Sequence, residues 1–287
     1  MKNFINISDH SSNDLRAIID EAKIRKLNRK NLNKSAPDED KPFEGKSMAM
    51  IFEKPSTRTR MSFDIAVKQL GGSSIILNPD GIHYGKGDET LKDTAKVLTE
   101  YVDIVMLRTS SHKNLEEFGK YLDIPIINGL SDIGHPCQIM SDILTYEESN
   151  GNIEGKTVSW LGDGNNNMSN SLIEAAGKFK FNLSIACPKK YSPNKIILSW
   201  AKKNNVNLVV TTKPEEAVKN SDCVMTDKWV SMNDKVNKKT KKKILKPFQV
   251  NKKLMSKANS DAIFMHCLPV GRGEEVTDEV IDGKQSV

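Results

Sequence analysis

Short apolar runs alternate with longer amphipathic stretches along almost the whole chain, and this alternation constrains the fold more than any other feature. In the first half, the runs "SMAMIF", "SSIILN", "VDIVMLR" and "IPIING" predict strands. The second half predicts further strands at residues 157–161, 182–186, 207–210, 222–226 and 261–265. Because strands that alternate with helices form βαβ units, the pattern indicates parallel sheets.

The stretches between the strands carry apolar residues at helical spacing. Helices are expected at residues 11–26, 57–70, 89–101, 114–122, 137–149, 169–179, 193–204, 214–219 and 248–257. In the first of these, Leu15, Ile18 and Ile19 are expected to form the apolar stripe, and Ala66 belongs to the stripe of the second. Ser11 is expected to cap the first helix.

The length of the chain fits two domains. With 287 residues, it can form two domains of ordinary size, and the junction is expected near residues 145–155. We therefore predict an α/β protein of two doubly wound parallel-sheet domains, 1–147 and 148–287, with the active site in the cleft between them. In such folds, ligands bind beyond the carboxyl ends of the strands.

Composition narrows the class of protein. The sequence has no apolar run long enough for a membrane span and no signal-peptide core, so a cytoplasmic protein without membrane contact is expected. The four Cys form no C-x-x-C pair, so no zinc or redox motif is predicted. The net charge is +6, and much of the excess lies in the lysine run at residues 235–246. No aromatics interleave these lysines, so we interpret the run as a solvated face rather than a nucleic-acid site.

The loop after the first strand, within "FEKPSTRTR" at residues 52–60, has the character of an anion site. Only seven of the 43 cationic residues are Arg, and Arg58 and Arg60 are two of them. Ser56 is expected to cap a helix whose free N–H groups and dipole attract an anion. Since the Gly-rich run of a Walker loop is absent, we interpret this stretch as a phosphate cradle of another kind. An ordinary polar helix cap is the alternative.

Other strand ends carry further candidates. Arg108 ends the third strand, and His135 and Gln138 lie between the fourth strand and the next helix. In the second half, "GDGNNN", "DKWVSMND" and "MHCLPVGRGEE" follow strands, although "GDGNNN" lacks the third Gly of a dinucleotide fingerprint. A direct dyad of His266 and Cys267 is not expected, because adjacent strand residues point to opposite faces.

Four of these stretches together resemble the signatures of ornithine carbamoyltransferases: "STRTR", "HPCQ", "DxxxSM" and "HCLP". They occur in the order and spacing of that family, and the resemblance covers essentially the whole chain. The first two are shared by the wider transcarbamoylase group, whereas "DxxxSM" with "HCLP" distinguishes ornithine from aspartate as the acceptor. The resemblance implies that the δ-amine of L-ornithine attacks carbamoyl phosphate to give L-citrulline and phosphate. It implies no metal and no organic cofactor.

The resemblance also implies a role for each matching residue. The phosphate would be bound by Ser56, Thr57, Arg58, Thr59 and Arg108. The carbonyl oxygen would be polarised by Arg108, Thr59 and His135. The carbamoyl group would be held by the "HPCQ" loop, which includes Pro136, Cys137 and Gln138, and by the backbone at Cys267 and Leu268. Ornithine would be bound by Asn167, Asp227, Ser231 and Met232. Asp227 and Cys267 would lie near the attacking amine.

Assembly and completeness are further expectations from the resemblance. In the family, the loop that matches "GIHYGKG" reaches the site of a neighbouring subunit, so a homotrimer with His83 contacting phosphate in trans is expected. Family members usually continue past "VTDEVIDGxQS" to a final helix that carries one more Arg. The chain, which ends at Val287, is therefore expected to lack that segment and to have weak or no activity. Whether flux runs toward arginine synthesis or breakdown stays open.

Three other interpretations remain on the sequence alone. A transcarbamoylase that acts on putrescine, aspartate or an acylated ornithine is the nearest, and the "SM" loop argues against it. The second is a phosphate- or nucleic-acid-binding module without enzymatic activity, an interpretation based on the basic net charge of the chain. A Rossmann oxidoreductase is the third, and nicotinamide binding would distinguish it.

Overall fold

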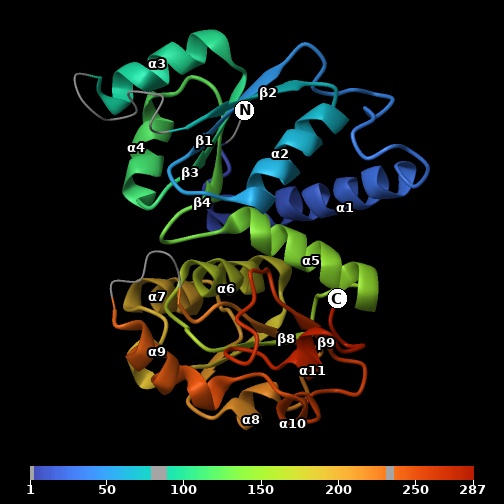
Figure 1. The fold of residues 1–287 in the computed structure, drawn as a ribbon, viewed down its shortest axis with the longest axis vertical. Coiled ribbons are helices and arrows are strands. Elements are labelled where there is room, and N and C mark those ends of the chain that lie inside the picture. The colour runs from blue at the N-terminus through green and yellow to red at the C-terminus, as the bar shows by residue number, and fades with distance from the viewer. Residues whose placement is uncertain (1–2, 79–88, 231–235) are drawn as a thin grey trace. The chain divides into compact units, whose positions relative to one another are not determined.

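The computed structural model describes residues 3–78, 89–230 and 236–287. It divides into two compact units, each of which is described by itself. The first contains the residues up to His10 and Ala17–Cys137, and the second contains Ser11–Arg16 and Gln138–Val287. The α/β class with two parallel sheets is confirmed (Figure 1). The domain limits 1–147 and 148–287, and the cleft, stay predictions.

The sheet of the first unit has four parallel strands in the order β2-β1-β3-β4. Its strands are β1 (Ser47–Phe52), β2 (Ser73–Leu77), β3 (Ile104–Arg108) and β4 (Ile126–Leu130). The chain passes from β1 to β2 on one side and then returns to place β3 on the other side of β1. This reversal makes the carboxyl ends of β1 and β3 the switch point at which such sheets bind ligands.

Helices cover both faces of this sheet. The unit contains η1 (Ile7–Asp9), most of α1 (Ser12–Asn28), α2 (Thr57–Gln69), α3 (Leu91–Tyr101) and α4 (His112–Tyr121). Figure 1 shows α3 and α4 on one side of the sheet and α2 on the other. Ile51 packs in the cluster that contains Phe118 of α4, whereas its neighbour Met50 packs with Val67 of α2. Successive strand residues therefore bury opposite faces, as a sheet covered on both sides requires.

The sheet of the second unit has five parallel strands in the order β7-β6-β5-β8-β9. Its strands are β5 (Thr157–Leu161), β6 (Asn182–Ala186), β7 (Leu208–Thr211), β8 (Cys223–Thr226) and β9 (Ile263–Met265). Here the order reverses between β5 and β8. The loops after β5 and β8 therefore form the second switch point.

Helices also cover this second sheet on both faces. They are α5 (Pro136–Asn150, from Gln138 on), α6 (Asn167–Phe179), α7 (Lys195–Lys203), α8 (Pro214–Val218), α9 (Lys238–Leu245), α10 (Lys252–Met255) and α11 (Asp278–Ile281), with the short turns η3 (Lys189–Tyr191) and η4 (Lys246–Phe248). Figure 1 shows α6 and α7 on one face and α8 and α10 on the other. Val224 and Phe264 of the sheet pack in the cluster that contains Leu254 of α10.

Some local predictions were wrong. Ile18 is 45% exposed because α1 buries the narrower pair Leu15 and Ile19, and Ala66 is also exposed. The helix expected at 248–257 is only α10, since Asn251 caps it by accepting a hydrogen bond from the N–H of Leu254 (2.9 Å) and the preceding residues form a 3-10 turn.

Among the described residues, the longest helices are too short or too polar to cross a bilayer.

Candidate functional site

The amino end of α2 lies directly beyond β1. Ser56 has extended backbone angles, and its Oγ accepts a hydrogen bond from the N–H of Thr59 (3.3 Å), so Ser56 is the helix cap that the sequence predicted. Thr57 and Arg58 follow in the first turn with their side chains exposed. The N–H groups of this turn that lack an acceptor within the helix provide anion donors at the sheet's switch point.

Arg108 is brought to the same place by the neighbouring strand. It ends β3 and pairs in register with Phe52, the last residue of β1. Its side chain is buried, and Nη1 donates to Oγ1 of Thr59 at 3.2 Å. The structure therefore gathers Ser56, Thr59 and Arg108 around one helix terminus. A planar guanidinium beside free N–H groups can bind a phosphate through two parallel hydrogen bonds.

Two further residues near the end of β1, Glu53 and Arg60, form hydrogen bonds to other parts of the protein. Glu53, which the sequence reasoning missed, accepts hydrogen bonds at Oε2 from Oγ1 of Thr109 (2.7 Å) and the N–H of Ser110 (3.0 Å). These bonds tie the loop after β3 to the end of β1. Arg60 donates to Oδ1 of Asn78 (2.6 Å), and its guanidinium carbon lies 4.7 Å from the Phe52 ring centroid. We therefore do not assign Arg60 to the phosphate cradle, although it lies two residues after Arg58.

His135 lies in the loop between β4 and α5. Burial and, to a smaller extent, the positive charge of Arg108 together lower the pKa of its imidazole to about 3. The side chain is therefore neutral near pH 7, and a neutral imidazole can donate one hydrogen bond. Pro136 begins α5, and the Cys137 thiol donates to the carbonyl of Asn128 (3.5 Å). Burial raises the pKa of Cys137 to about 12, so this sulfur is no thiolate nucleophile.

Gln138 lies one helical turn before an acid that the sequence reasoning did not single out. Its Nε2 donates to Oδ1 of Asp142 at 2.9 Å, and Asp142 is only 8% exposed. Burial raises the pKa of Asp142 to about 7. The hydrogen bond from Gln138 opposes this rise, and the nearby charge of Asp227 adds to it. The spacing of four residues after Gln138 was the signal available in the sequence.

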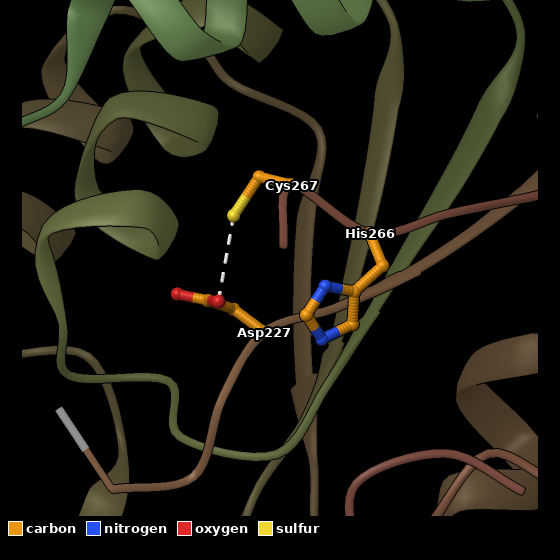
Figure 2. Close-up of side chains that lie close together, drawn as sticks. All are labelled: Asp227, His266 and Cys267. Carbon is orange, nitrogen blue, oxygen red and sulfur yellow. Dashed lines mark hydrogen bonds between the residues drawn. The ribbon is translucent and has the colours of Figure 1, made fainter. Parts of the chain in front are cut away.

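In the second unit, Asp227 and Cys267 meet beyond the ends of β8 and β9. The Cys267 thiol points at Asp227, with Sγ 3.4 Å from Oδ1 (Figure 2). The same oxygen accepts a hydrogen bond from the N–H of Lys228 at 2.7 Å. Burial raises the pKa of Asp227, whereas these hydrogen bonds lower it. A half-buried carboxylate of this kind is suited to receive an ammonium or amine group.

His266 lies beside this pair (Figure 2). Nδ1 accepts a hydrogen bond from the N–H of Leu268 (2.9 Å), so the ring proton is on Nε2, which donates to Oε1 of Glu275 at 3.2 Å. His266 and Cys267 do not alternate as neighbouring strand residues would, because β9 already ends at Met265. Ligand atoms of Asp227, His266 and Cys267 all lie within 4.8 Å of one another, a spacing that could hold a metal ion. That no metal is needed stays a prediction.

The loop between β5 and α6 carries the last described candidate. Asn166 caps α6 by accepting a hydrogen bond from the N–H of Ser169, which makes Asn167 the first helical residue. Asp163 in the same loop is buried against Lys241 of α9, with Nζ 2.6 Å from Oδ2. The solvated-face interpretation of the lysine run is therefore wrong for Lys241, whose ammonium also lies 5.2 Å from the Tyr191 ring centroid.

Three predicted site residues, His83, Ser231 and Met232, lie outside the described residues. The other candidates fall into two groups. Ser56, Thr57, Arg58, Thr59 and Arg108 are at the switch point of the first sheet, and Asn167 and Asp227 are at that of the second. His135, Pro136 and Cys137 follow β4, Gln138 continues α5, and Cys267 and Leu268 follow β9.

The fold and these two groups define a class: doubly wound α/β proteins with polar ligand-binding loops at the switch points of two parallel sheets. Residues 2–148 match the family model described as the aspartate/ornithine carbamoyltransferase carbamoyl-P binding domain, and residues 154–287 match that of the Asp/Orn binding domain. The chain therefore belongs to the aspartate/ornithine carbamoyltransferase family.

Individual relatives agree with this assignment. The chain is 50% identical over 287 residues to the ornithine carbamoyltransferase of Brucella ovis, covering all of this chain and 89% of that protein. It is similar to the solved ornithine carbamoyltransferase of Pyrococcus furiosus, with a TM-score of 0.92, 41% identity, and coverage of 100% of this chain and 90% of that one. For the anabolic enzyme of Campylobacter jejuni, the TM-score is 0.90 at 37% identity, with 98% and 91% coverage.

Proposed function

We propose that this protein transfers the carbamoyl group of carbamoyl phosphate to the δ-amine of L-ornithine, giving L-citrulline and phosphate. The observation that carries the proposal is the pair of switch points. One gathers cationic and N–H donors suited to phosphate, and the other brings a half-buried carboxylate to a thiol. Membership of the family ties this arrangement to carbamoyl transfer.

The phosphate is proposed to bind at the amino end of α2. Ser56, Thr57, Arg58 and Thr59 supply hydroxyl, backbone and guanidinium donors, and Arg108 adds a buried positive charge. The support is the hydrogen bond between Arg108 and Thr59, which fixes the guanidinium beside the helix terminus. Neutralising the phosphate charge makes it a better leaving group, because the electron pair that it takes away is stabilised.

The carbonyl oxygen gains negative charge as the amine attacks. Arg108, Thr59 and His135 are the proposed donors to that oxygen. The neutral state of His135 suits this role, because a neutral imidazole donates a proton in a hydrogen bond without repelling Arg108. In the attack, the bond from the ornithine nitrogen to the carbonyl carbon forms. The bond from that carbon to the phosphate oxygen then breaks, and the nitrogen loses one proton.

The carbamoyl amide and the amine have their own proposed partners. Gln138 and the backbone at Cys267 and Leu268 hold the amide, with Pro136 and Cys137 shaping the same loop. Asp227 and Cys267 orient the δ-amine, supported by the contact between their side chains. Asn167, Ser231 and Met232 are assigned to ornithine by the family resemblance.

The remaining parts of the proposal concern the whole protein. We propose a cytoplasmic homotrimer that acts in arginine metabolism and to which His83 contributes across subunits, as the family resemblance implies. Domain 1–147 would bind carbamoyl phosphate and domain 148–287 ornithine. Light scattering on the purified protein measures its mass in solution and so tests the trimer. A monomeric mass would contradict this part of the proposal.

The acceptor is tested by a substrate panel. Purified protein with carbamoyl phosphate is given L-ornithine, L-aspartate, putrescine or N-acetyl-L-ornithine, and carbamoylated products are separated by chromatography. We expect product with ornithine at a rate at least a hundredfold above the others, because a site built to pair polar groups rejects acceptors that lack them. Faster carbamoylation of any other acceptor would contradict the proposal.

A further inference from the structure

Gln138 poses a question of orientation, because its amide can present either an oxygen or an NH₂ group to a ligand. The two ends of a Gln amide have nearly the same shape but opposite hydrogen-bonding character. A carbamoyl group also offers both, a carbonyl oxygen and an NH₂. Which end of Gln138 faces the ligand therefore decides which part of the carbamoyl group it can recognise.

Asp142, which lies on the same helix, determines the orientation of the Gln138 amide. Its Oδ1 accepts the hydrogen bond from Nε2 of Gln138 at 2.9 Å, across one turn of α5. Above its pKa of about 7, the Asp142 carboxyl group is ionised and only accepts hydrogen bonds, so it selects the NH₂ end of the amide. Nε2 is thereby held against Asp142, and Oε1 of Gln138 is left as the end available to a ligand.

The surroundings of Asp142 favour a fixed pair over a loose surface contact. The residue is 8% exposed, so little water competes for the bond. Its Oδ2 is buried without a hydrogen-bond partner among the described residues, so the bond to Gln138 is the one that orients the carboxyl group. Two nearby charged or titratable groups affect the pKa of Asp142. Asp227, which follows β8, raises it, and His266, which follows β9, lowers it.

We propose that Asp142 is a positioning residue that holds Gln138 with Oε1 toward the substrate, so that Gln138 accepts a hydrogen bond from the carbamoyl NH₂ and discriminates carbamoyl phosphate from acyl phosphates that lack it. The inference rests on the proposed function, since it assigns Gln138 to the carbamoyl group. It adds a specificity determinant, because acetyl phosphate has a methyl group in place of the NH₂ and cannot donate.

The experiment measures the affinities of carbamoyl phosphate and acetyl phosphate by isothermal titration calorimetry. In Asp142→Leu, which removes the acceptor, we expect the preference for carbamoyl phosphate to fall about tenfold, the scale for one lost hydrogen bond. Acetyl phosphate affinity should stay within about twofold. Asp142→Asn offers an NH₂ group as well as an oxygen, so it no longer selects one end of the Gln138 amide and should also lower the preference. Glu148→Leu, an exposed acid on the same helix, is the matched control and should match wild type.

The outcomes separate the two proposals. If Asp142→Leu weakens both phosphates equally, or leaves the preference intact, Asp142 does not orient Gln138 and this inference is overturned while the proposed function stands. If Asp142→Leu does not fold, an unchanged preference in Asp142→Asn overturns it instead. If wild-type protein shows no affinity for carbamoyl phosphate, the proposed function itself fails.

Discussion

At the scale of single residues, the candidate site depends on a few polar groups that the fold removes from water. Arg108 and His135 are the main examples in the first unit, and the charge of Arg108 affects the protonation state of His135. The guanidinium charge and burial together keep the imidazole neutral. A buried cation and a neutral hydrogen-bond donor side by side can both stabilise a bound anion, because the neutral donor does not repel the cation.

The first prediction concerns the planar fork of Arg108. Arg108→Lys keeps the charge but loses the paired donors, so we expect carbamoyl phosphate to bind roughly tenfold to a hundredfold more weakly, equivalent to about 1.5–3 kcal/mol. Arg60→Lys is the control, because Arg60 contacts Asn78 and Phe52 instead. Calorimetric titration measures both. Equal effects of the two substitutions would remove Arg108 from the proposed phosphate site.

The second prediction concerns pH and His135. Its folded-state pKa of about 3 lies below the ordinary 6.5, so below pH 6.5 the unfolded chain binds a proton that the folded chain does not. Stability should therefore fall with decreasing pH, by about 2 kcal/mol at pH 5 from this residue. Urea unfolding at pH 7.5 and pH 5.0 measures it in wild type and His135→Gln. The variant should lose about 2 kcal/mol less; an identical loss would contradict a neutral buried His135.

At the scale of elements, two contacts organise the loops that carry the candidates. Ser56 begins α2 at the carboxyl end of β1, so the cap and the proposed cradle are the same few residues. In the second unit, the ion pair of Lys241 and Asp163 attaches α9 to the loop before α6. The first could be predicted from the sequence, because a cap is a local pattern. The second could not, since its partners are far apart in the chain.

The third prediction separates the two roles of Ser56. Ser56→Ala removes the cap and should lower stability by about 1 kcal/mol. Ser56→Asp keeps a capping oxygen and should retain stability, but its negative charge should repel phosphate and weaken carbamoyl phosphate binding at least tenfold. Thermal unfolding and calorimetry measure the two effects. Phosphate binding by Ser56→Asp at wild-type affinity would argue for an ordinary helix cap.

The fourth prediction concerns the buried ion pair. Lys241→Met leaves the carboxylate of Asp163 buried and unpaired, which should cost about 3–5 kcal/mol of unfolding free energy. Adding Asp163→Asn should recover most of this loss, because the isolated charge is then gone. Lys242→Met is the control; Lys242 pairs with Glu274 at the surface and should change stability by less than about 1 kcal/mol. No recovery in the double variant would mean that Lys241 acts by packing alone.

At the scale of the whole molecule, the alternating pattern was enough to predict both parallel sheets. The strands at 157–161 and 182–186 have the predicted limits, because buried parallel strands are continuous apolar runs bounded by polar turns. Arg108, His135 and Gln138 could be singled out because they follow strands. Asp142 offered a weaker local signal, its spacing of four residues after Gln138 on the same helix. Glu53 and Glu275 could not be singled out, because their partners are decided by three-dimensional packing.

Carbamoyl transfer to ornithine is tested most directly by measuring citrulline and phosphate together. Purified protein is incubated with carbamoyl phosphate and L-ornithine, and citrulline is measured colorimetrically beside released phosphate, corrected for the spontaneous breakdown of carbamoyl phosphate without protein. We expect enzyme-dependent formation of both products in equal amounts, abolished when ornithine is omitted. Phosphate release without citrulline, or no release above the spontaneous rate, would contradict it.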